Sequence, residues 1–488
     1  MSTRPPQDRI DQLTAARTQL VNDRTPISRS WRERAERSMP LGVPSSFQDS
    51  PPYPIYFERG KGSRVWDVDG NEYSDYHNGF GVMTVGHAHP AIVEACSERF
   101  SMGTHFAQPV AETTLAAEAL RSRFNLDMVR FTNSGTESTM DACRLARAHK
   151  RRDKLVKIEG TYHGHHETVM VSVKPEGSTI GPREKPLSIP YGLGAPHVLT
   201  DLTLVVPFND AEALARVLEE NAGEVAGLIM EPIMMNVGII EPDDGYLQAV
   251  RDLCDAHDIV LIWDEVKTGA TVAYGGAEEL YGVQPDIKCF AKAVGGGTPT
   301  GAFGGKAAIM EEITADRMPQ LGTFNGNPLA ARAMLVTLTE ILTPDAYAEL
   351  NRINEAQKAA CQRVIDAYDL PMYTTGMGGK GAVLYAPTRL RNYRDYAGVD
   401  GGVGIDKELS YLSWLFQVTE GVFMTPGYDE QWTLSVQHTD EDVERYVTSF
   451  ETFAREVTGR TDVQVDGAAP AGEAAAGFDH LPEDVPQA

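Results

Sequence analysis

Lys292 is the residue in this chain whose surroundings best fit covalent chemistry. It follows the apolar run Ile287–Phe290 and precedes three glycines, Gly295–Gly297. At the end of a buried strand a lysine loses hydration, which lowers the pKa of its amine and makes it a nucleophile able to form a Schiff base. The alternative is a solvated lysine beside a flexible loop. Lys288 lies earlier in the same run, and we do not expect it to react.

An acidic pair, Asp264 and Glu265, follows a second apolar run, Ile259–Trp263. In open α/β sheets the carboxyl ends of the strands face the ligand crevice, so Asp264 could form an ion pair with a buried cation there. A strand-ending aspartate also commonly caps the following helix, and these residues alone leave that alternative open.

The sequence also contains a signature of an anion site. The segment Asn133–Ser138 follows the apolar run Met128–Thr132 and opens a helix expected over Thr136–Lys150. Free N–H groups and the dipole at a helix N-terminus favour a phosphate, although the same residue types are ordinary helix caps. A second polar loop, Gly322–Pro328, also precedes a helix and could contact a phosphate.

An aromatic residue, Tyr162, follows the apolar run Leu155–Ile158 and could stack on a planar ring. Three nearby histidines, His163, His165 and His166, raise the alternative of a metal site. No carboxylate or cysteine completes a known ligand spacing, so we expect no metal.

Each of these features is weak by itself, but their order along the chain is informative. A helix-start anion site, an aromatic residue, an acid at a strand end and a lysine at the next strand end suit one ligand, pyridoxal 5′-phosphate (PLP). Its phosphate requires an anion site, its ring a stacking partner, its pyridine nitrogen an acid and its aldehyde a lysine. The sequence therefore predicts PLP as cofactor, converted to pyridoxamine 5′-phosphate (PMP) in a half-reaction.

Over roughly residues 28–458, the chain resembles the class III aminotransferases, which are PLP enzymes of fold type I, and most closely the glutamate-1-semialdehyde aminomutase-like branch. The segments that carry the resemblance are NSGTESTMDACRLAR, KIEGTYHGHH, LIWDEVKTG, AKAVGGGTPTGAFGG and GTFNGNP.

The resemblance assigns roles to these residues. It implies that Lys292 is the Schiff-base lysine and proton shuttle and that Asp264 keeps the pyridine nitrogen protonated. It further implies that Tyr162 stacks on the ring. The other implied cofactor contacts are Ser134, Gly135 and Thr136 at the phosphate, Thr323 reaching it from the neighbouring subunit, and His163, Glu231 and Asn236 beside the ring. A site completed in this way implies an obligate homodimer.

The chain departs from the family pattern where a substrate would bind. Ser45 matches the family, but Gln48 stands where the aminomutases have an arginine that holds the substrate carboxylate. A neutral amide cannot supply a bidentate ionic clamp. Glu430 matches a family active-site glutamate in different surroundings. We therefore expect an aminotransferase that moves an amino group between an amino acid or amine and a carbonyl acceptor, with an aminomutase as the alternative.

Composition narrows the class of protein. The chain has 488 residues and a net charge of −25, which disfavours binding to nucleic acid. Its five cysteines are scattered and never in CxxC spacing, which is typical of a reducing compartment. No apolar run is long enough to span a membrane, and no signal peptide opens the chain, so we expect a cytoplasmic protein.

Short apolar runs that alternate with helical patterns between about residues 90 and 290 predict the elements that position these residues. Such a pattern is typical of a buried, mainly parallel sheet. We expect an α/β protein of the PLP-dependent transferase fold type I, with a smaller α+β domain built from N- and C-terminal segments. A Pro- and Gly-rich stretch, 175–200, could form a lid. The expected units are a mobile arm (1–27) with one helical piece over Arg9–Val21, the N-terminal part of the small domain (28–90), a large PLP-binding domain (91–330), the C-terminal small domain (331–460) and a disordered acidic tail (461–488).

Overall fold

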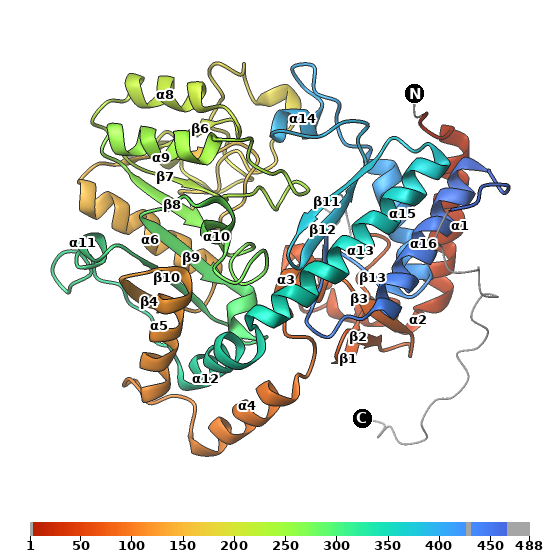
Figure 1. Ribbon diagram of the computed structural model, residues 1–488, viewed down its shortest axis with the longest axis horizontal. Coiled ribbons are helices and arrows are strands. Elements are labelled where there is room, and N and C mark those ends of the chain that lie inside the picture. Colours follow the sequence, from red (N-terminus) through yellow and green to blue (C-terminus); the bar gives the residue numbers. More distant parts are fainter. Residues whose placement is uncertain (1–2, 426–430, 466–488) are drawn as a thin grey trace.

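The computed structural model describes residues 3–425 and 431–465 and is built around a seven-stranded sheet of order β4-β10-β9-β8-β7-β5-β6 (Figure 1). The six strands other than β10 correspond to the apolar runs predicted from the sequence. The strands are β4 (Met128–Thr132), β5 (Lys154–Ile158), β6 (Thr203–Val206), β7 (Val225–Met230), β8 (Val260–Asp264), β9 (Ile287–Ala291) and β10 (Gly301–Gly305).

Five neighbouring strands, from β9 to β6, run parallel, whereas β10 pairs antiparallel with both β4 and β9. The sequence did not predict β10, because GAFGG lacks the β-branched residues that mark a strand. Its glycines have a packing role: a Cβ on Gly301 would approach the carbonyl oxygen of Ser134 to 2.6 Å. This close approach brings the start of β10 against the first turn of the helix that follows β4.

Helices cover both faces of the sheet and separate two cores. Along β8, Val260 and Ile262 pack on the side of α6 (Gly135–Lys150), and Leu261 and Trp263 pack on the opposite side. The second face is covered by α8 (Ala211–Glu220) and α9 (Tyr246–Ala256). Consecutive residues of β8 point to opposite faces of the sheet, and these four are all apolar because the strand is buried on both faces.

The remaining helices of the large domain are α4 (Pro90–Met102), α5 (Ala111–Phe124), α7 (His197–Thr200), α10 (Ala277–Tyr281), α11 (Ala307–Met310) and α12 (Pro328–Val336). Of these helices, α5 and α11 contact β4, and α4 and α5 pack against α12.

The small domain combines segments from both ends of the chain, as the sequence predicts. One sheet has the order β1-β2-β3-β13, so that Val422 and Phe423 of the C-terminal part pair with β3. The other has the order β11-β12-β14. The strands are β1 (Phe57–Lys61), β2 (Arg64–Asp67), β3 (Glu72–Asp75), β11 (Tyr373–Met377), β12 (Lys380–Leu384), β13 (Val422–Phe423) and β14 (Gln431–Thr433), and the helices are α2 (Pro26–Ala35), α3 (Asn78–Gly81), α13 (Pro344–Tyr368), α14 (Tyr393–Ala397), α15 (Lys407–Thr419) and α16 (Asp440–Thr458).

The N-terminal segment contains the expected helical piece, and this helix packs against the rest of the chain. Residues Gln7–Arg24 form one helix, α1, which lies beside α15 and α16 (Figure 1). Arg17 stacks on the ring of Phe416 at 3.8 Å and forms an ion pair with Glu420. An arginine that covers an aromatic ring buries its stem while keeping its charge solvated, so a polar helix can dock without an apolar stripe.

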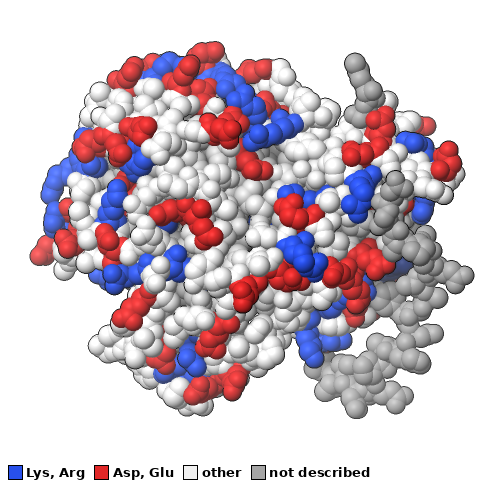
Figure 2. Space-filling view, viewed as in Figure 1, with Lys and Arg blue, Asp and Glu red and all other residues white. Residues whose placement is uncertain are grey.

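The surface mixes the two signs of charge. Figure 2 shows acidic and basic side chains beside one another on both halves of this face. In the described part of the chain, no helix combines the length and apolarity needed to cross a membrane. Most of the expected acidic tail, residues 466–488, lies outside the described residues, whereas Val463 and Val465 pack against the core.

Candidate active site

A cavity of about 530 Å³ lies at the carboxyl edge of the central sheet, between the large and small domains. The loops that follow β4, β5, β7, β8 and β9 all reach it. Its lining includes the predicted residues Ser134, Gly135, Thr136, Tyr162, His163, Glu231, Asn236, Asp264 and Lys292. Side chains that are scattered over more than 150 positions of the sequence therefore share one space, because parallel strands end at the same edge.

The first turn of α6 forms one wall of this cavity. Ser134 caps the helix, with its hydroxyl accepting a hydrogen bond from the Glu137 amide at 3.2 Å. Gly135 has no room for a side chain, since a Cβ would approach Val266 to 2.9 Å. The helix dipole and the free amides of this turn make the wall suitable for an anion.

Asp264 ends β8 and is nearly buried. One carboxylate oxygen lies 2.8 Å from Nδ1 of His163, and the other accepts a hydrogen bond from the Val266 amide at 3.0 Å. His163 is itself anchored, because its carbonyl oxygen accepts a hydrogen bond from the Thr139 hydroxyl. The sequence placed His163 beside the cofactor, and the structure joins it to Asp264, where it fixes the orientation of the carboxylate.

Lys292 comes directly after β9 and lines the cavity. Its backbone adopts φ of +52°, a conformation that side-chain-bearing residues rarely take and that clusters at functional sites. Burial lowers the pKa of its amine, and the carboxylates of Asp264 and Glu231 act in the opposite direction. No hydrogen bond or ion pair links this amine to another described residue, so it is available to a ligand.

Glu231 and Tyr162 both line the cavity. The Glu231 carboxylate accepts hydrogen bonds from the Asn236 amide group at 2.8 Å and the Met235 amide at 2.7 Å. The ring of Tyr162 meets Phe47 edge to face, with 5.3 Å between centroids.

Four predicted site residues are not among the lining residues. Thr323 is exposed on its loop, and Ser45 and Gln48 are also exposed, whereas their neighbour Phe47 lines the cavity. Glu430 lies outside the described residues.

Sequence reasoning missed three cations of the cavity, Lys174, Lys267 and Lys380. Lys267 follows Asp264 by three positions within a motif already noted, so its place at the strand end was a usable signal. Lys380 lies in β12 of the small domain, where no local pattern distinguishes it from a surface lysine. Among the described residues no group of three or more potential ligands forms a metal site.

These residues fit PLP. The α6 N-terminus suits its phosphate, the anchored Asp264 suits its pyridine nitrogen, and the available Lys292 amine suits its aldehyde. The fold and the cavity thus define a PLP-dependent enzyme of the α/β transferase type.

Comparison with known proteins gives the family. The profile of the aminotransferase class-III family matches residues 46–389, and the chain belongs to this family. It is 37% identical over 441 residues to a glutamate-1-semialdehyde 2,1-aminomutase of Methanopyrus kandleri, covering 90% of this chain and 99% of the relative.

Two solved structures extend the likeness to the whole fold. An omega-transaminase from Sphaerobacter thermophilus superposes with a TM-score of 0.83 at 32% identity, over 88% of this chain and 97% of that chain. A glutamate-1-semialdehyde aminomutase from Pseudomonas aeruginosa PAO1, in complex with PMP, gives 0.85 at 25% identity, over 93% and 100% of the two chains. The chain is therefore an enzyme with PLP as its cofactor, and its relatives include both transaminases and aminomutases.

Proposed function

We propose that this enzyme is an aminotransferase that moves an amino group from an amino acid or amine to a separate carbonyl acceptor. The observation that carries the choice of transaminase over aminomutase is the lining of the cavity. No arginine occurs among the described lining residues, and Gln48, at the position of the aminomutase arginine, is exposed outside the lining. The 37% identity to an aminomutase keeps intramolecular transfer as the second candidate.

In this proposal each residue has a distinct task. Bound PLP supplies an aldehyde that captures the amine and a ring that withdraws electrons from it. Ser134, Gly135 and Thr136 hold the phosphate, and Asp264, oriented by His163, keeps the ring nitrogen protonated. The Lys292 amine first binds the cofactor covalently. Once released, it removes a proton from the substrate carbon and donates that proton to a second atom.

The lowered pKa of Lys292 supports this second task. An amine that gives up its proton more readily than an ordinary lysine spends more of its time as a base at neutral pH. Tyr162 and Asn236 complete the walls beside the ring.

The transaminase and the aminomutase are distinguished by their need for a second substrate. Purified holoenzyme is mixed with an amino donor, with and without an added keto acid, and product is followed over many turnovers. A transaminase stops after one equivalent per site unless the keto acid is present. Continued conversion of glutamate 1-semialdehyde without any acceptor contradicts the proposal and establishes the aminomutase.

The proposal includes a homodimer in which Thr323 of each subunit reaches the phosphate bound by the other. Thr323 is exposed in the single chain, in a loop that also exposes Leu321 and Phe324, with 86% and 58% of their surfaces accessible. Such apolar exposure is typical of a surface that a partner covers. A cytoplasmic location is part of the same proposal and is supported by the five free cysteines.

A further inference from the structure

Lys380 is one of three lysines that are fully buried in the described chain, and it differs from the other two in its partners. Lys157 donates hydrogen bonds to the carbonyl oxygens of Thr161 and Val171. Lys288 donates to the carbonyl oxygen of Phe124 and forms an ion pair with Glu278. The amine of Lys380, a residue that is 2% exposed, donates to the hydroxyl of Thr433 at 2.8 Å, and to no other group among the described residues.

A buried ammonium group without an anionic partner is costly, because burial removes its hydration and nothing replaces it. Here the cost is increased by other cations. Burial lowers the pKa of Lys380 well below its usual value, and the charges of Lys267 and Lys292 lower it further. No acid among the described residues forms an ion pair with it.

The surroundings of Lys380 direct its amine to the cavity. Both Lys380 and Thr433 line it, and they come from adjacent strands of the small domain, where the two residues are paired in register. The amine lies over Gly81, where φ is +86° and any side chain would collide with it. The amine therefore has a specific place, prepared by both the sheet and the turn at α3.

The cavity as a whole shows the same excess of positive charge. Among its described lining residues are the lysines Lys174, Lys267, Lys292 and Lys380, against two carboxylates, Glu231 and Asp264. The whole chain has a net charge of −25, so this local reversal of sign is a property of the site. Local reversal of sign within a cleft concentrates a ligand of opposite charge.

The phosphate of the cofactor does not account for Lys380. The phosphate wall is the first turn of α6 in the large domain, whereas Lys380 comes from β12 in the small domain. An anion on that side of the cavity would give Lys380 the charged partner that it lacks among the described residues. An amino acid bound for transfer of its amino group brings one, its carboxylate.

We propose that Lys380, held by Thr433, binds the carboxylate of the substrate, so that the enzyme acts on amino acids in preference to amines that lack a carboxylate. This inference rests on the proposed aminotransferase function and names its substrate class. It also supplies the cation that the exposed Gln48 does not provide. Lys267, which donates to the carbonyl oxygen of Met235 at 2.8 Å, adds its positive field to the same subsite.

The first test measures binding without turnover. Holoenzyme, whose phosphate wall is already filled, is titrated with butanoate and, in parallel, with neutral butanamide by calorimetry. We expect Lys380→Met and Lys380→Gln to bind butanoate about tenfold or more weakly than wild type, the size of a lost charged hydrogen bond, with butanamide unaffected. Lys306→Met is the matched control, since Lys306 lies at the opposite edge of the sheet, and it should bind butanoate as wild type does.

The second test compares matched donors. The rate at which cofactor absorbance changes is measured with alanine and with 2-aminopropane, which replaces the carboxylate by a methyl group. Wild type should prefer alanine, and Lys380→Met should lose that preference because the rate with alanine falls far more than the rate with 2-aminopropane. Thermal unfolding verifies that each variant is folded.

The outcomes separate the two proposals. If both Lys380 variants are folded and bind butanoate like wild type, or keep the preference for alanine, the carboxylate subsite is wrong although transamination stands. If the wild type transfers no amino group from any donor, but the Lys380 variants bind butanoate more weakly than the wild type does, the proposed function is wrong and the anion subsite stands.

Discussion

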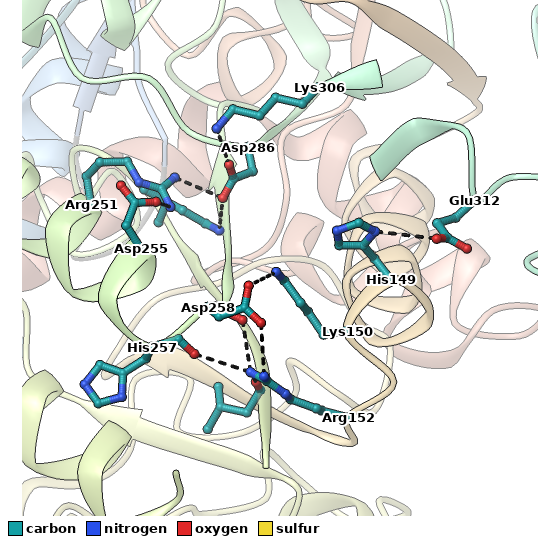
Figure 3. A network of polar contacts seen from close by, with 12 residues as sticks. His149, Lys150, Arg152, Arg251, Asp255, His257, Asp258, Asp286, Lys306 and Glu312 are labelled. Atoms are coloured by element: carbon teal, nitrogen blue, oxygen red, sulfur yellow. Dashed lines mark hydrogen bonds and ion pairs between the residues drawn. The ribbon is translucent and has the colours of Figure 1, made fainter. Parts of the chain in front are cut away.

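At the amino-terminal edge of the central sheet, Asp258 and Asp286 each pair with two cations, whereas at the carboxyl edge Asp264 and Lys292 are not joined in an ion pair. Asp286, just before β9, accepts hydrogen bonds from Arg251 at 2.9 Å, Lys306 at 2.6 Å and the Leu261 amide at 2.8 Å (Figure 3). Asp258, before β8, forms ion pairs with Lys150 and Arg152. At the other ends of the same two strands lie Asp264, held by one histidine and one amide, and Lys292, whose amine has no described partner.

The difference shows that charged residues at one edge of the sheet stabilise the fold, whereas those at the other edge serve catalysis. Paired charges at the amino-terminal edge stabilise the fold and are unavailable to a ligand. At the carboxyl edge, Lys292 has no ion-pair partner among the described residues, and burial lowers the pKa of its amine, which costs stability and favours reactivity. Substitutions at the two edges should therefore affect different measurements.

The largest expected effect is on catalysis, from Lys292→Ala. Removal of the amine eliminates covalent attachment of the cofactor and proton transfer, and the second loss alone is worth roughly 10²- to 10⁴-fold in rate. The purified variant should also lack the visible absorbance of lysine-bound PLP. The midpoint of urea unfolding should hardly change, and a variant that retained full activity would remove Lys292 from the mechanism.

A substitution at the opposite edge, Asp286→Ala, should lower the stability of the protein and leave its activity nearly unchanged. It leaves Arg251 without its buried partner and the Leu261 amide without an acceptor, and breaking such a buried pair costs about 3 kcal/mol. Urea unfolding measures that loss, while the rate per folded molecule should stay near the wild-type value. A large loss of activity at unchanged stability would contradict the division between the edges.

Acid should act on the two edges at different pH. Burial lowers the pKa of His166, near α6, to about 3, so this histidine is neutral in the folded protein. Its stabilisation is fully present above the unfolded pKa of about 6.5 and is lost as pH falls from there toward the folded value.

For Asp286, burial by itself would raise the pKa, but the hydrogen bonds from Lys306 and Leu261 and the charge of Arg251 lower it. This stabilisation is present above the unfolded pKa of about 3.9 and is lost only as pH falls through the lowered value. Between about pH 6.5 and pH 5.5 the free energy of unfolding of the wild type should fall by about 1 kcal/mol because of His166, and His166→Gln should remove this fall. In the same pH range Asp286→Ala should not change how the free energy of unfolding depends on pH. Urea unfolding as a function of pH measures both.

The smallest effect is expected from Lys306→Met. The lysine side chain is 47% exposed, and an exposed partner of an ion pair contributes no more than about 1 kcal/mol. Asp286 would keep Arg251, so the midpoint of unfolding should move slightly and activity should not change. A destabilisation as large as that of Asp286→Ala would show that the network depends on Lys306.

Much of the large domain could be predicted from the sequence, since six of its seven strands are short apolar runs between helices. The exception, β10, has no side-chain signal because three of its residues are glycines, and at Gly301 a side chain would collide with the carbonyl oxygen of Ser134. The helix α1 could be predicted, but its packing could not: only Ile10 and Val21 of its residues are buried, and its docking depends on arginine contacts that no periodicity reports.

The sequence by itself determined the cofactor class and the residues that follow each apolar strand, because parallel strands place their carboxyl ends at one edge whatever the rest of the chain does. Only the tertiary structure decided that His163 holds Asp264 and that Lys380 enters the cavity. Lys380 and Lys292 are 88 positions apart in the chain and belong to different domains. Electrostatic interaction depends on distance in space and on burial, and neither is encoded locally around a single lysine.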